Sequence, residues 1–331
     1  MPHALVVGGA GYIGAVATDL LLESGWDVTV ADNLSTGHPQ SLPATATFIE
    51  VDIRDRLKIK EALQQVQPDV VLHFAAKAYV GDSFPQSPEY FDVNVGGTTA
   101  LLAAMHETGV KRIVFSSSCT VYGEPDLVPM DETAVVKPAV SPYGQTKQMC
   151  ETAMRWQGET VGLSSYLLRY FNAAGAWKHL GEDHQPETHL IPIVIDAALG
   201  RRGRLKVFGS DYPTPDGTCI RDYVHVRDLA SAHLAACEKL LAGADGHQEV
   251  VNLGTGIGSS IFDVIKAVEE ISGESIPYDL LPRRPGDPPE LVASNGKARS
   301  HLGWEPKHSS LRDVVESAWE WRKNHPDGYP K

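Results

Sequence analysis

The stretch VVGGAGYIGA, residues 6–15, follows a short apolar run and opens a segment of helical period. It contains Gly8-x-x-Gly11-x-x-Gly14, and a glycine turn of this kind between a strand and a helix lets the backbone approach a pyrophosphate at the helix N-terminus. Asp32 follows Gly14 by 18 residues, where a carboxylate would bind an adenosine ribose and repel a 2′-phosphate. The stretch therefore predicts a dinucleotide site that favours NAD over NADP.

Around this turn, short apolar runs alternate with longer segments of helical period. The predicted strands are residues 4–7, 27–32, 47–52, 69–76, 112–118 and 164–171. The predicted helices between them are residues 12–25, 54–66 and 87–109, and one that Ser141 and Pro142 open. Such alternation predicts an α/β fold of the Rossmann type, with a doubly wound parallel sheet and a ligand crevice at the carboxyl ends of its strands.

The alternation breaks after residue 173, where the chain becomes rich in Gly, Pro, Asp and His. We therefore expect an NAD-binding domain over residues 1–173 and a smaller C-terminal α/β region, mainly for the substrate, over residues 174–331. Apolar segments near residues 224–255 are expected to return to the main sheet. A last helix is expected within residues 309–326.

Composition excludes several classes of function. The chain has 331 residues and a formal net charge of −13, which argues against nucleic acid or an anionic membrane as the main partner. Four cysteines without C-x-x-C spacing indicate reduced thiols in a cytoplasm, and 13 histidines without a metal-binding motif predict no metal site. No apolar run reaches the ~18 residues of a membrane span.

A second motif gives the chemistry. The predicted fifth strand ends at Ser118, and the next helix carries Tyr143-x-x-x-Lys147, whose two side chains share one helix face. A lysine cation stabilises a phenolate and lowers the pKa of the tyrosine, so Tyr143 is expected to remove a hydroxyl proton while hydride leaves the same carbon. Ser118 would hydrogen-bond the reacting oxygen. The alternative is that Tyr143 and Lys147 form a solvated surface pair beside loop hydroxyls. The serine at the strand end makes this alternative the less favoured of the two.

These motifs resemble those of a known family. GGAGYIG, Ser118 and Tyr143-x-x-x-Lys147 are similar to the extended short-chain dehydrogenase/reductases. HFAA, SPYGQTK, RYFNAAGA, HLIP, FGSDYPTPDGTCIRDYVHV and NLGTG resemble, more narrowly, the UDP-galactose (UDP-glucose) 4-epimerase family, over nearly the whole chain. The resemblance implies bound NAD, a UDP-sugar substrate and a homodimer formed through helices near residues 88–107 and 143–158.

The resemblance also implies further contacts with the cofactor. Besides the three glycines, Asp32 and the Tyr143–Lys147 pair, these come from Tyr12, Ile13, Asn33, Asp52, Ile53, Phe74, Ala75, Ala76, Asn94 and Tyr170. Asp52 would meet the adenine edge, although helix capping is an equally good interpretation of it. The family has a lysine shortly after the HFA motif, and Lys77 lies one position away from it. Only a weak contact of Lys77 with the cofactor is therefore expected.

The substrate contacts that the resemblance implies are Ser118, Tyr143, Asn172, His189, Leu190, Phe208, Arg221, Arg284, Asp287 and Leu291. Asn172 and the two arginines would bind the diphosphate. Phe208 would lie against the uracil, and Leu190 would give a backbone contact. A salt bridge to Asp222 or Asp228 is the alternative for Arg221, and core packing is the alternative for Phe208. His189 replaces the asparagine that some members carry.

The function that these features predict is reversible inversion at C4 of UDP-glucose and UDP-galactose, through a 4-keto sugar and bound NAD. Cys119 and Thr120 occupy the positions where related dehydratases have acidic residues. Without a carboxylate for elimination, the reaction is expected to stop at the 4-keto sugar and return the hydride. Leu291 matches the position of the sugar-pocket gate, and it is intermediate in size, so UDP-N-acetylhexosamines or UDP-pentoses such as UDP-xylose and UDP-arabinose remain alternative substrates. A non-catalytic sensor of NAD or nucleotide sugars is a remote alternative.

Overall fold

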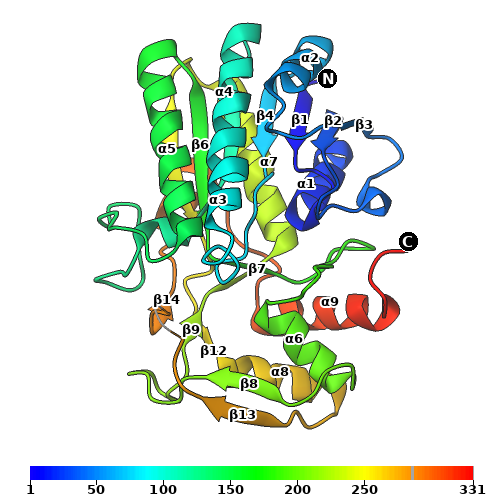
Figure 1. Cartoon of the computed structure of the whole chain (residues 1–331), viewed down its shortest axis with the longest axis vertical. Helices are drawn as coiled ribbons and strands as arrows, with labels where there is room; N and C mark the ends of the chain where they lie inside the picture. Colours follow the sequence, from blue (N-terminus) through cyan, green and yellow to red (C-terminus); the bar gives the residue numbers. More distant parts are fainter. Residues whose placement is uncertain (285–286, 331) are drawn as a thin grey trace.

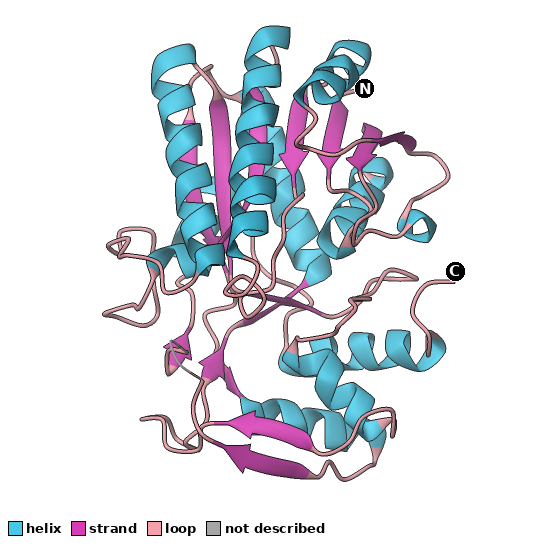
Figure 2. Ribbon diagram, in the orientation of Figure 1, coloured by secondary structure: helices cyan, strands magenta, loops and turns pink. Residues whose placement is uncertain are grey.

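Seven parallel strands form the main sheet of the protein (Figures 1 and 2). The structure is a computed structural model, and it describes residues 1–284 and 287–330. The strand order is β11-β6-β5-β4-β1-β2-β3. The strands are β1 (His3–Val7), β2 (Asp27–Asp32), β3 (Thr47–Glu50), β4 (Val70–His73), β5 (Arg112–Ser118), β6 (Ser164–Tyr170) and β11 (Gln248–Leu253). This is the doubly wound order of a Rossmann-type sheet, so the predicted fold class is confirmed.

Helices cover both faces of this sheet because each strand alternates the direction of its apolar side chains. In β1, Ala4 and Val6 pack toward α1 and α7, whereas Leu5 and Val7 pack toward α2, α4 and α5. The bounds of these helices are α1 (Tyr12–Glu23), α2 (Arg56–Val66), α4 (Gly97–Thr108), α5 (Pro142–Val161) and α7 (Val226–Ala242). Figure 1 shows α4 and α5 side by side in front of the sheet.

The predicted helix over residues 87–109 is not uniform. It divides into α3 (Ser87–Tyr90), a π-helical turn at Phe91–Gly96, and α4. At the start of α4, a Cβ on Gly97 would lie 2.5 Å from Cγ2 of Ile53, so this glycine permits close packing against the segment before α2. The π turn places the Asn94 side chain inward, where the site uses it.

A smaller region lies below the sheet in Figure 1 and has its own apolar core. Its helices are α6 (Leu190–Ala198), α8 (Ile261–Ser272) and α9 (Leu311–Asn324). Its strands are β7 (Asn172–Ala174), β8 (Leu205–Phe208), β9 (Ile220–Arg221), β10 (Tyr223–His225), β12 (Ser259–Ser260), β13 (Tyr278–Leu281) and β14 (Glu290–Leu291). The boundary proposed at residue 173 falls within β7, and α7 and β11 lie with the main sheet.

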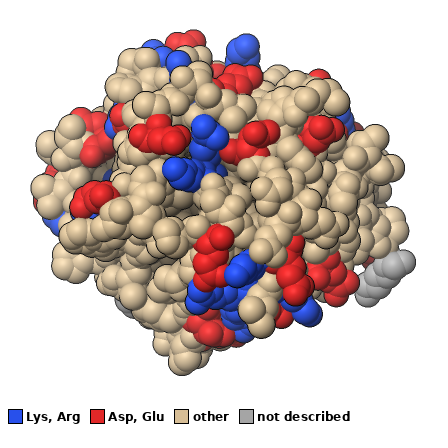
Figure 3. Space-filling model, turned by 90° about the horizontal axis from the view of Figure 1, so that it is seen from above, with Lys and Arg blue, Asp and Glu red and all other residues tan. Residues whose placement is uncertain are grey.

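Charge on the face at the top of Figure 1 is mixed. Figure 3 shows its Lys and Arg side chains next to Asp and Glu side chains, without a continuous basic field. Ion pairs at this end of the sheet include Lys60 with Glu107 at 2.8 Å. Among the helices of residues 1–284 and 287–330, none has the length and apolar character needed to span a bilayer.

Buried histidines make the fold sensitive to acid. Burial lowers the pKa of His233 to about 4 and that of His73 to about 3. Their folded-state pKa values lie below the unfolded value of about 6.5, so unfolding takes up protons and the stability present above pH 6.5 is lost as the pH falls toward 4. We expect each histidine to contribute a slope of up to about 1.4 kcal/mol per pH unit to the free energy of unfolding.

Urea denaturation between pH 7 and pH 4.5 measures this slope. His233 is the informative site, because its Nδ1 donates to the Leu229 carbonyl at 2.8 Å, while its buried Nε2 has no partner among the described residues. His233→Phe is expected to flatten the slope, and His106→Phe at an exposed position is the control. An unchanged slope in His233→Phe would show that this histidine is protonated in the folded protein.

Candidate active site

The glycine turn between β1 and α1 leaves room for a phosphate group. Gly8 has φ +82°, and a Cβ on it would lie 2.4 Å from the backbone nitrogen of Ala75. A Cβ on Gly14 would lie 2.2 Å from the Gly8 oxygen, whereas at Gly11 nothing approaches closer than 3.5 Å. Gly11 is the N-cap of α1 and gives no side-chain cap, so the first N–H groups of the helix remain available. These residues fit a pyrophosphate held at the helix N-terminus.

Asp32 lies at the carboxyl end of β2, beside this turn. Its two carboxylate oxygens accept from the backbone nitrogens of Ala10 at 3.0 Å and Leu34 at 2.8 Å. Burial raises the pKa of Asp32, and these backbone hydrogen bonds oppose that effect. A carboxylate oxygen has two lone pairs, so each oxygen can also accept from a ribose hydroxyl.

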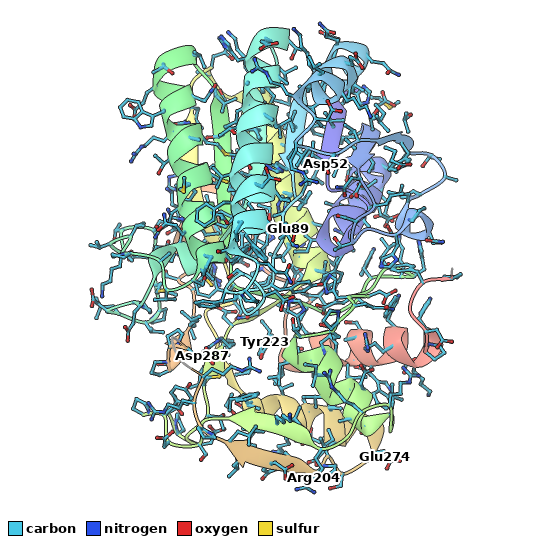
Figure 4. All side chains as sticks on the ribbon, viewed as in Figure 1. Asp52, Glu89, Arg204, Tyr223, Glu274 and Asp287 are labelled. Carbon is cyan, nitrogen blue, oxygen red and sulfur yellow. The ribbon has the colours of Figure 1, made fainter. Side chains whose placement is uncertain are left out.

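Asp52 is held by protein groups. Its carboxylate receives Nε of Arg54 at 2.9 Å and Nδ2 of Asn33 at 2.9 Å, and the hydrogen bonds from Arg54 hold its pKa well below the usual range. The capping interpretation of Asp52 is wrong, because Asp55 caps α2 by accepting from the Lys58 nitrogen. Figure 4 labels Asp52 near the strands of the main sheet, far from Asp287 in the lower half.

Asn94 fixes the segment that leaves β4, which includes Phe74, Ala75 and Ala76. Its Oδ1 accepts from the Lys77 nitrogen at 2.8 Å, and its Nδ2 donates to the Lys77 oxygen and to Oγ1 of Thr146, both at 3.0 Å. Both amide hydrogens of Asn94 are therefore used within the protein. The Lys77 ammonium pairs with Glu89 at 2.7 Å, which Figure 4 labels.

Ser118, Tyr143 and Lys147 meet at the carboxyl end of β5. Ser141 caps α5 by accepting from the Gly144 nitrogen at 3.1 Å, which sets the start of the helix. Ser118 lies beside the Tyr143 hydroxyl, close enough to affect its pKa, and Nζ of Lys147 lies 5.8 Å from the centre of the Tyr143 ring. All three side chains are buried. The predicted constellation of three residues is thus present in space.

Burial dominates the electrostatics of this group. It raises the pKa of Tyr143 well above its usual value, while the neighbouring Ser118 hydroxyl acts in the opposite direction. Burial also lowers the pKa of Lys147 to about 8. The net direction for Tyr143 is the opposite of what the tyrosine–lysine pair alone predicts, because desolvation of the phenolate is the largest effect on the pKa of this hydroxyl.

Two further tyrosines from the predicted cofactor set lie near the turn and the triad. The Tyr170 hydroxyl is hydrogen-bonded to Oγ of Ser116, and Nζ of Lys147 donates to the Ser116 carbonyl at 2.7 Å. The Tyr12 hydroxyl donates to the Gly175 carbonyl at 2.5 Å. Ser116 thereby links the ends of β5 and β6 to the lysine, and Tyr12 links α1 to the segment after β7.

Arg221 and Asp287, both predicted to contact substrate, form an ion pair with each other. The Arg221 side chain is 12% exposed and also donates to the carbonyls of Pro288 at 3.0 Å and Ile220 at 2.7 Å. The alternative salt bridges of Arg221 to Asp222 or Asp228 are therefore wrong. Figure 4 shows Asp287 beside β14. These contacts fix the position of the guanidinium.

Arg284 and Phe208 also lie together. The Arg284 guanidinium is stacked on the Phe208 ring, 4.0 Å from its centre. Phe208 is half-buried at the end of β8 and carries a cation on its face, so core packing does not account for it. Leu291 is in register with Arg221 across β14 and β9, and it packs in the cluster that contains Cys119, next to Ser118.

Three substrate candidates come from the segments between β7 and α6. Nδ2 of Asn172 donates to the Asp222 oxygen at 3.2 Å, and Leu190 is the first residue of α6. His189 is the N-cap of α6, and its Nδ1 lies 2.7 Å from Oε1 of Glu182, so this nitrogen is engaged within the protein.

Sequence reasoning missed Asp222, which is fully buried. Its carboxylate accepts from the backbone nitrogens of Thr255 at 2.9 Å, Gly256 at 3.1 Å and Ala293 at 3.2 Å. These bonds tie the residue after Arg221 to the NLGTG loop and to the strand of Leu291. An acidic residue inside the apolar stretch IRDYVHV was the available signal.

Comparisons with known proteins agree with this geometry. Residues 4–254 match the model of the NAD dependent epimerase/dehydratase family. A UDP-glucose 4-epimerase of Halalkalibacterium halodurans is 50% identical over 327 residues, 98% of this chain and 97% of the relative. The structure of UDP-glucose 4-epimerase from Brucella ovis in complex with NAD is 44% identical, covers 97% of this chain and 98% of its own, and superposes with a TM-score of 0.92.

A third relative has a nucleotide as well as the cofactor. The structure of UDP-glucose 4-epimerase from Bifidobacterium longum, in complex with NAD+ and UDP, is 37% identical and superposes with a TM-score of 0.93 over 99% of this chain and 100% of its own. The match of the family model extends over more than half of the chain, and the similarity of the relatives extends over nearly all of it. This protein belongs to the NAD dependent epimerase/dehydratase family.

Proposed function

We propose that this protein is an NAD-dependent UDP-glucose 4-epimerase, which interconverts UDP-glucose and UDP-galactose. The observation that carries the proposal is the meeting of Ser118, Tyr143 and Lys147 at the end of β5, below a glycine turn that fits a pyrophosphate. The proposal is supported by relatives with this activity at 44–50% identity over nearly the whole chain.

In the proposed mechanism, Tyr143 removes the proton of the C4 hydroxyl, and Ser118 hydrogen-bonds the oxygen at C4. NAD, held by the glycine turn and Asp32, would supply the acceptor and the donor of the C4 hydride. The Lys147 cation stabilises the phenolate, and its pKa of about 8 keeps most of it charged at neutral pH. Because burial alone favours the neutral phenol, the positive charge of Lys147 is needed beside Tyr143.

Inversion also needs a sugar that turns while its nucleotide stays bound. Arg221 and Arg284 would anchor the diphosphate, since guanidinium groups bind phosphate oxygens in a fixed geometry. Phe208, already stacked on Arg284, would present its half-buried ring to the uracil. Leu291 would line the sugar pocket with an aliphatic side chain, which makes no directed bond to one face of the ketone.

The complete set of Ser118, Tyr143 and Lys147 argues against a non-catalytic sensor, because a sensor needs no acid/base group. Cys119 and Thr120 argue against dehydration, since neither gives a carboxylate for a second proton transfer. Burial raises the pKa of the Cys119 thiol to about 12, so it is neutral at physiological pH. The 4-keto sugar is then reduced again, and the enzyme is ready for the next turnover.

Proton NMR of the purified protein with UDP-glucose, UDP-N-acetylglucosamine and UDP-xylose tests both function and sugar choice. We expect fastest epimerisation of UDP-glucose. Leu291→Tyr narrows the pocket and is expected to lower kcat/KM for UDP-N-acetylglucosamine by about tenfold or more relative to UDP-glucose. Leu291→Met, of similar volume, is the control.

Each outcome of that experiment bears on one part of the proposal. Protein that binds NAD and leaves every UDP-sugar unchanged is not an epimerase. Turnover of UDP-N-acetylglucosamine or UDP-xylose in preference to UDP-glucose would replace the substrate and keep the mechanism. An unaltered preference in Leu291→Tyr would show that Leu291 does not line the sugar pocket.

We further propose a homodimer through the helices near residues 88–107 and 143–158. Met149 and Trp156 are 41% and 56% exposed, and their spacing of seven residues places them on one face of α5. Pairing α4 and α5 with the same helices of a second copy would bury this apolar surface in a four-helix interface.

Trp156→Glu is expected to convert the dimer into a monomer, because a carboxylate at the centre of an apolar interface is desolvated without a partner. Light scattering coupled to size-exclusion chromatography measures the mass. Another tryptophan, Trp26, is buried and cannot serve as a surface control. The control is therefore Leu280→Glu, at an exposed apolar residue on β13. A dimer that persists in Trp156→Glu would exclude this interface.

A cytoplasmic location completes the proposal. All four cysteine thiols are free and buried, which agrees with a reducing compartment. Fractionation of cells that express the protein, followed by immunoblotting, tests this location, and recovery in the membrane or secreted fraction would contradict it.

A further inference from the structure

Four side chains from the segment between β7 and α6 converge on one point. They are Glu182, His184, Glu187 and His189, and one nitrogen or oxygen of each lies within 4.8 Å of the others. The sequence predicted no metal site, because the spacing E-x-H-x-x-E-x-H lies in a loop and matches no helical metal motif. Folding of the loop nevertheless gives two imidazoles and two carboxylates a common centre.

The separations of the polar atoms bracket those of ligands around one metal ion. Nδ1 of His189 lies 2.7 Å from Oε1 of Glu182 and 3.0 Å from Oε1 of Glu187. Nδ1 of His184 lies 3.2 Å from Oε1 of Glu182 and 3.9 Å from Oε2 of Glu187. Zinc bonds of about 2.0–2.2 Å in a tetrahedron separate neighbouring ligand atoms by roughly 3.3–3.5 Å, within the range observed here.

Two of these atoms lack a hydrogen-bond partner within the described part of the chain. Oε2 of Glu187 is buried and unpaired, on a side chain that is only 6% exposed. Nδ1 of His184 is also buried and makes no hydrogen bond, although it lies 3.2 Å from Oε1 of Glu182. A buried carboxylate oxygen without a partner is costly, and a cation at the centre of the cluster would satisfy both atoms at once.

The surroundings suit a closed structural site. The Tyr79 ring packs against His184 at 5.4 Å and against His189 at 5.6 Å between centres, and Tyr12 packs edge-on against His184 at 6.2 Å. These rings come from the segment after β4 and from α1. A metal ion bound by the loop would therefore hold it against the main-sheet region, directly before Leu190.

We propose that Glu182, His184, Glu187 and His189 bind one zinc ion that stabilises this loop. Imidazole nitrogens and carboxylate oxygens are both zinc ligands, and four of them complete a tetrahedral structural site with no position left for a reacting molecule. The ion is thus structural, and the site does not depend on the proposed function. His184 also lines an open groove with Asp183, Arg322 and Tyr329, which gives a hydrated cation access from solvent.

The test begins with the complete protein after treatment with a chelator and dialysis. Titration calorimetry with Zn²⁺ is expected to show one site per chain, and Zn²⁺ is expected to raise Tm. Co²⁺ is expected to give the intense visible absorption of a tetrahedral complex. Glu187→Gln and His184→Asn are each expected to weaken Zn²⁺ binding by more than about tenfold. His179→Asn, an exposed histidine of the same segment outside the cluster, is expected to bind Zn²⁺ as the native chain does.

The outcomes separate a metal site from a hydrogen-bonded network of histidine and carboxylate. Native protein that binds no Zn²⁺ stoichiometrically, or whose Tm is the same with chelator and with Zn²⁺, would overturn the proposal, and this result needs no variant to fold. Binding that weakens equally in His179→Asn, or stays unchanged in Glu187→Gln, would place the ion elsewhere. A Co²⁺ spectrum of octahedral type would also contradict a closed four-ligand site.

Discussion

Tyr143→Phe will lower kcat for the epimerisation of UDP-glucose by a factor of about 10² to 10⁴, with the affinity for UDP nearly unchanged. The substitution removes only the hydroxyl that accepts the substrate proton, and it leaves a ring that fills the same buried volume. The proposed diphosphate contacts, Arg221 and Arg284, lie on other elements, so binding of UDP is not expected to depend on this hydroxyl. Steady-state kinetics and calorimetry with UDP give the two quantities.

A second tyrosine provides a matched control. Tyr166 is buried on β6, and its hydroxyl is outside the proposed site, so Tyr166→Phe is expected to keep kcat within about twofold. Thermal unfolding of both variants shows whether the fold is intact. A Tyr143→Phe protein that retains more than a tenth of the native kcat would mean that another group takes the C4 proton, and the assignment of Tyr143 would be wrong.

The features predicted correctly from sequence have local causes. Alternating strands and helices, the glycine turn at Gly8 and the N-cap at Ser141 are each set by residues close together in the chain, and the alternation indicates a doubly wound parallel sheet. The proximity of Ser118 to Tyr143 follows from one additional rule, that the carboxyl ends of parallel strands lie at one edge of a sheet. These local signals were sufficient to predict the fold class and the proximity of Ser118 to Tyr143.

The features that sequence could not predict depend on contacts between distant segments. Asp287 is 66 residues from Arg221, and no local sequence pattern near either residue predicts their ion pair. The raised pKa of Tyr143 follows from its burial, which only the packed structure reveals. The cluster of Glu182 and His184 depends on an irregular loop, whose path is set by packing against Tyr79 and Tyr12 rather than by a periodic pattern.

Glu151→Ala is expected to reduce the free energy of unfolding by about 3–5 kcal/mol, because it leaves the Arg169 guanidinium without its partner inside the protein. Glu151 on α5 accepts from Arg169 on β6 at 2.8 Å and 2.5 Å, and from Oγ of Ser117 at 2.5 Å. The side chains of Arg169 and Glu151 are only 7% and 11% exposed. Urea denaturation monitored by circular dichroism measures the loss, and Glu159→Ala, at an exposed position of α5, is the control.

A double variant separates the charge from the packing. Glu151→Met with Arg169→Met removes both charges and keeps apolar volume, so it is expected to recover most of the stability that Glu151→Ala loses. The pair also joins α5 to the sheet one turn beyond Lys147, so Glu151→Ala is expected to lower kcat as well. A loss below about 1 kcal/mol in Glu151→Ala would show that water reaches Arg169, and that apolar contacts hold α5 and its Tyr143 in place.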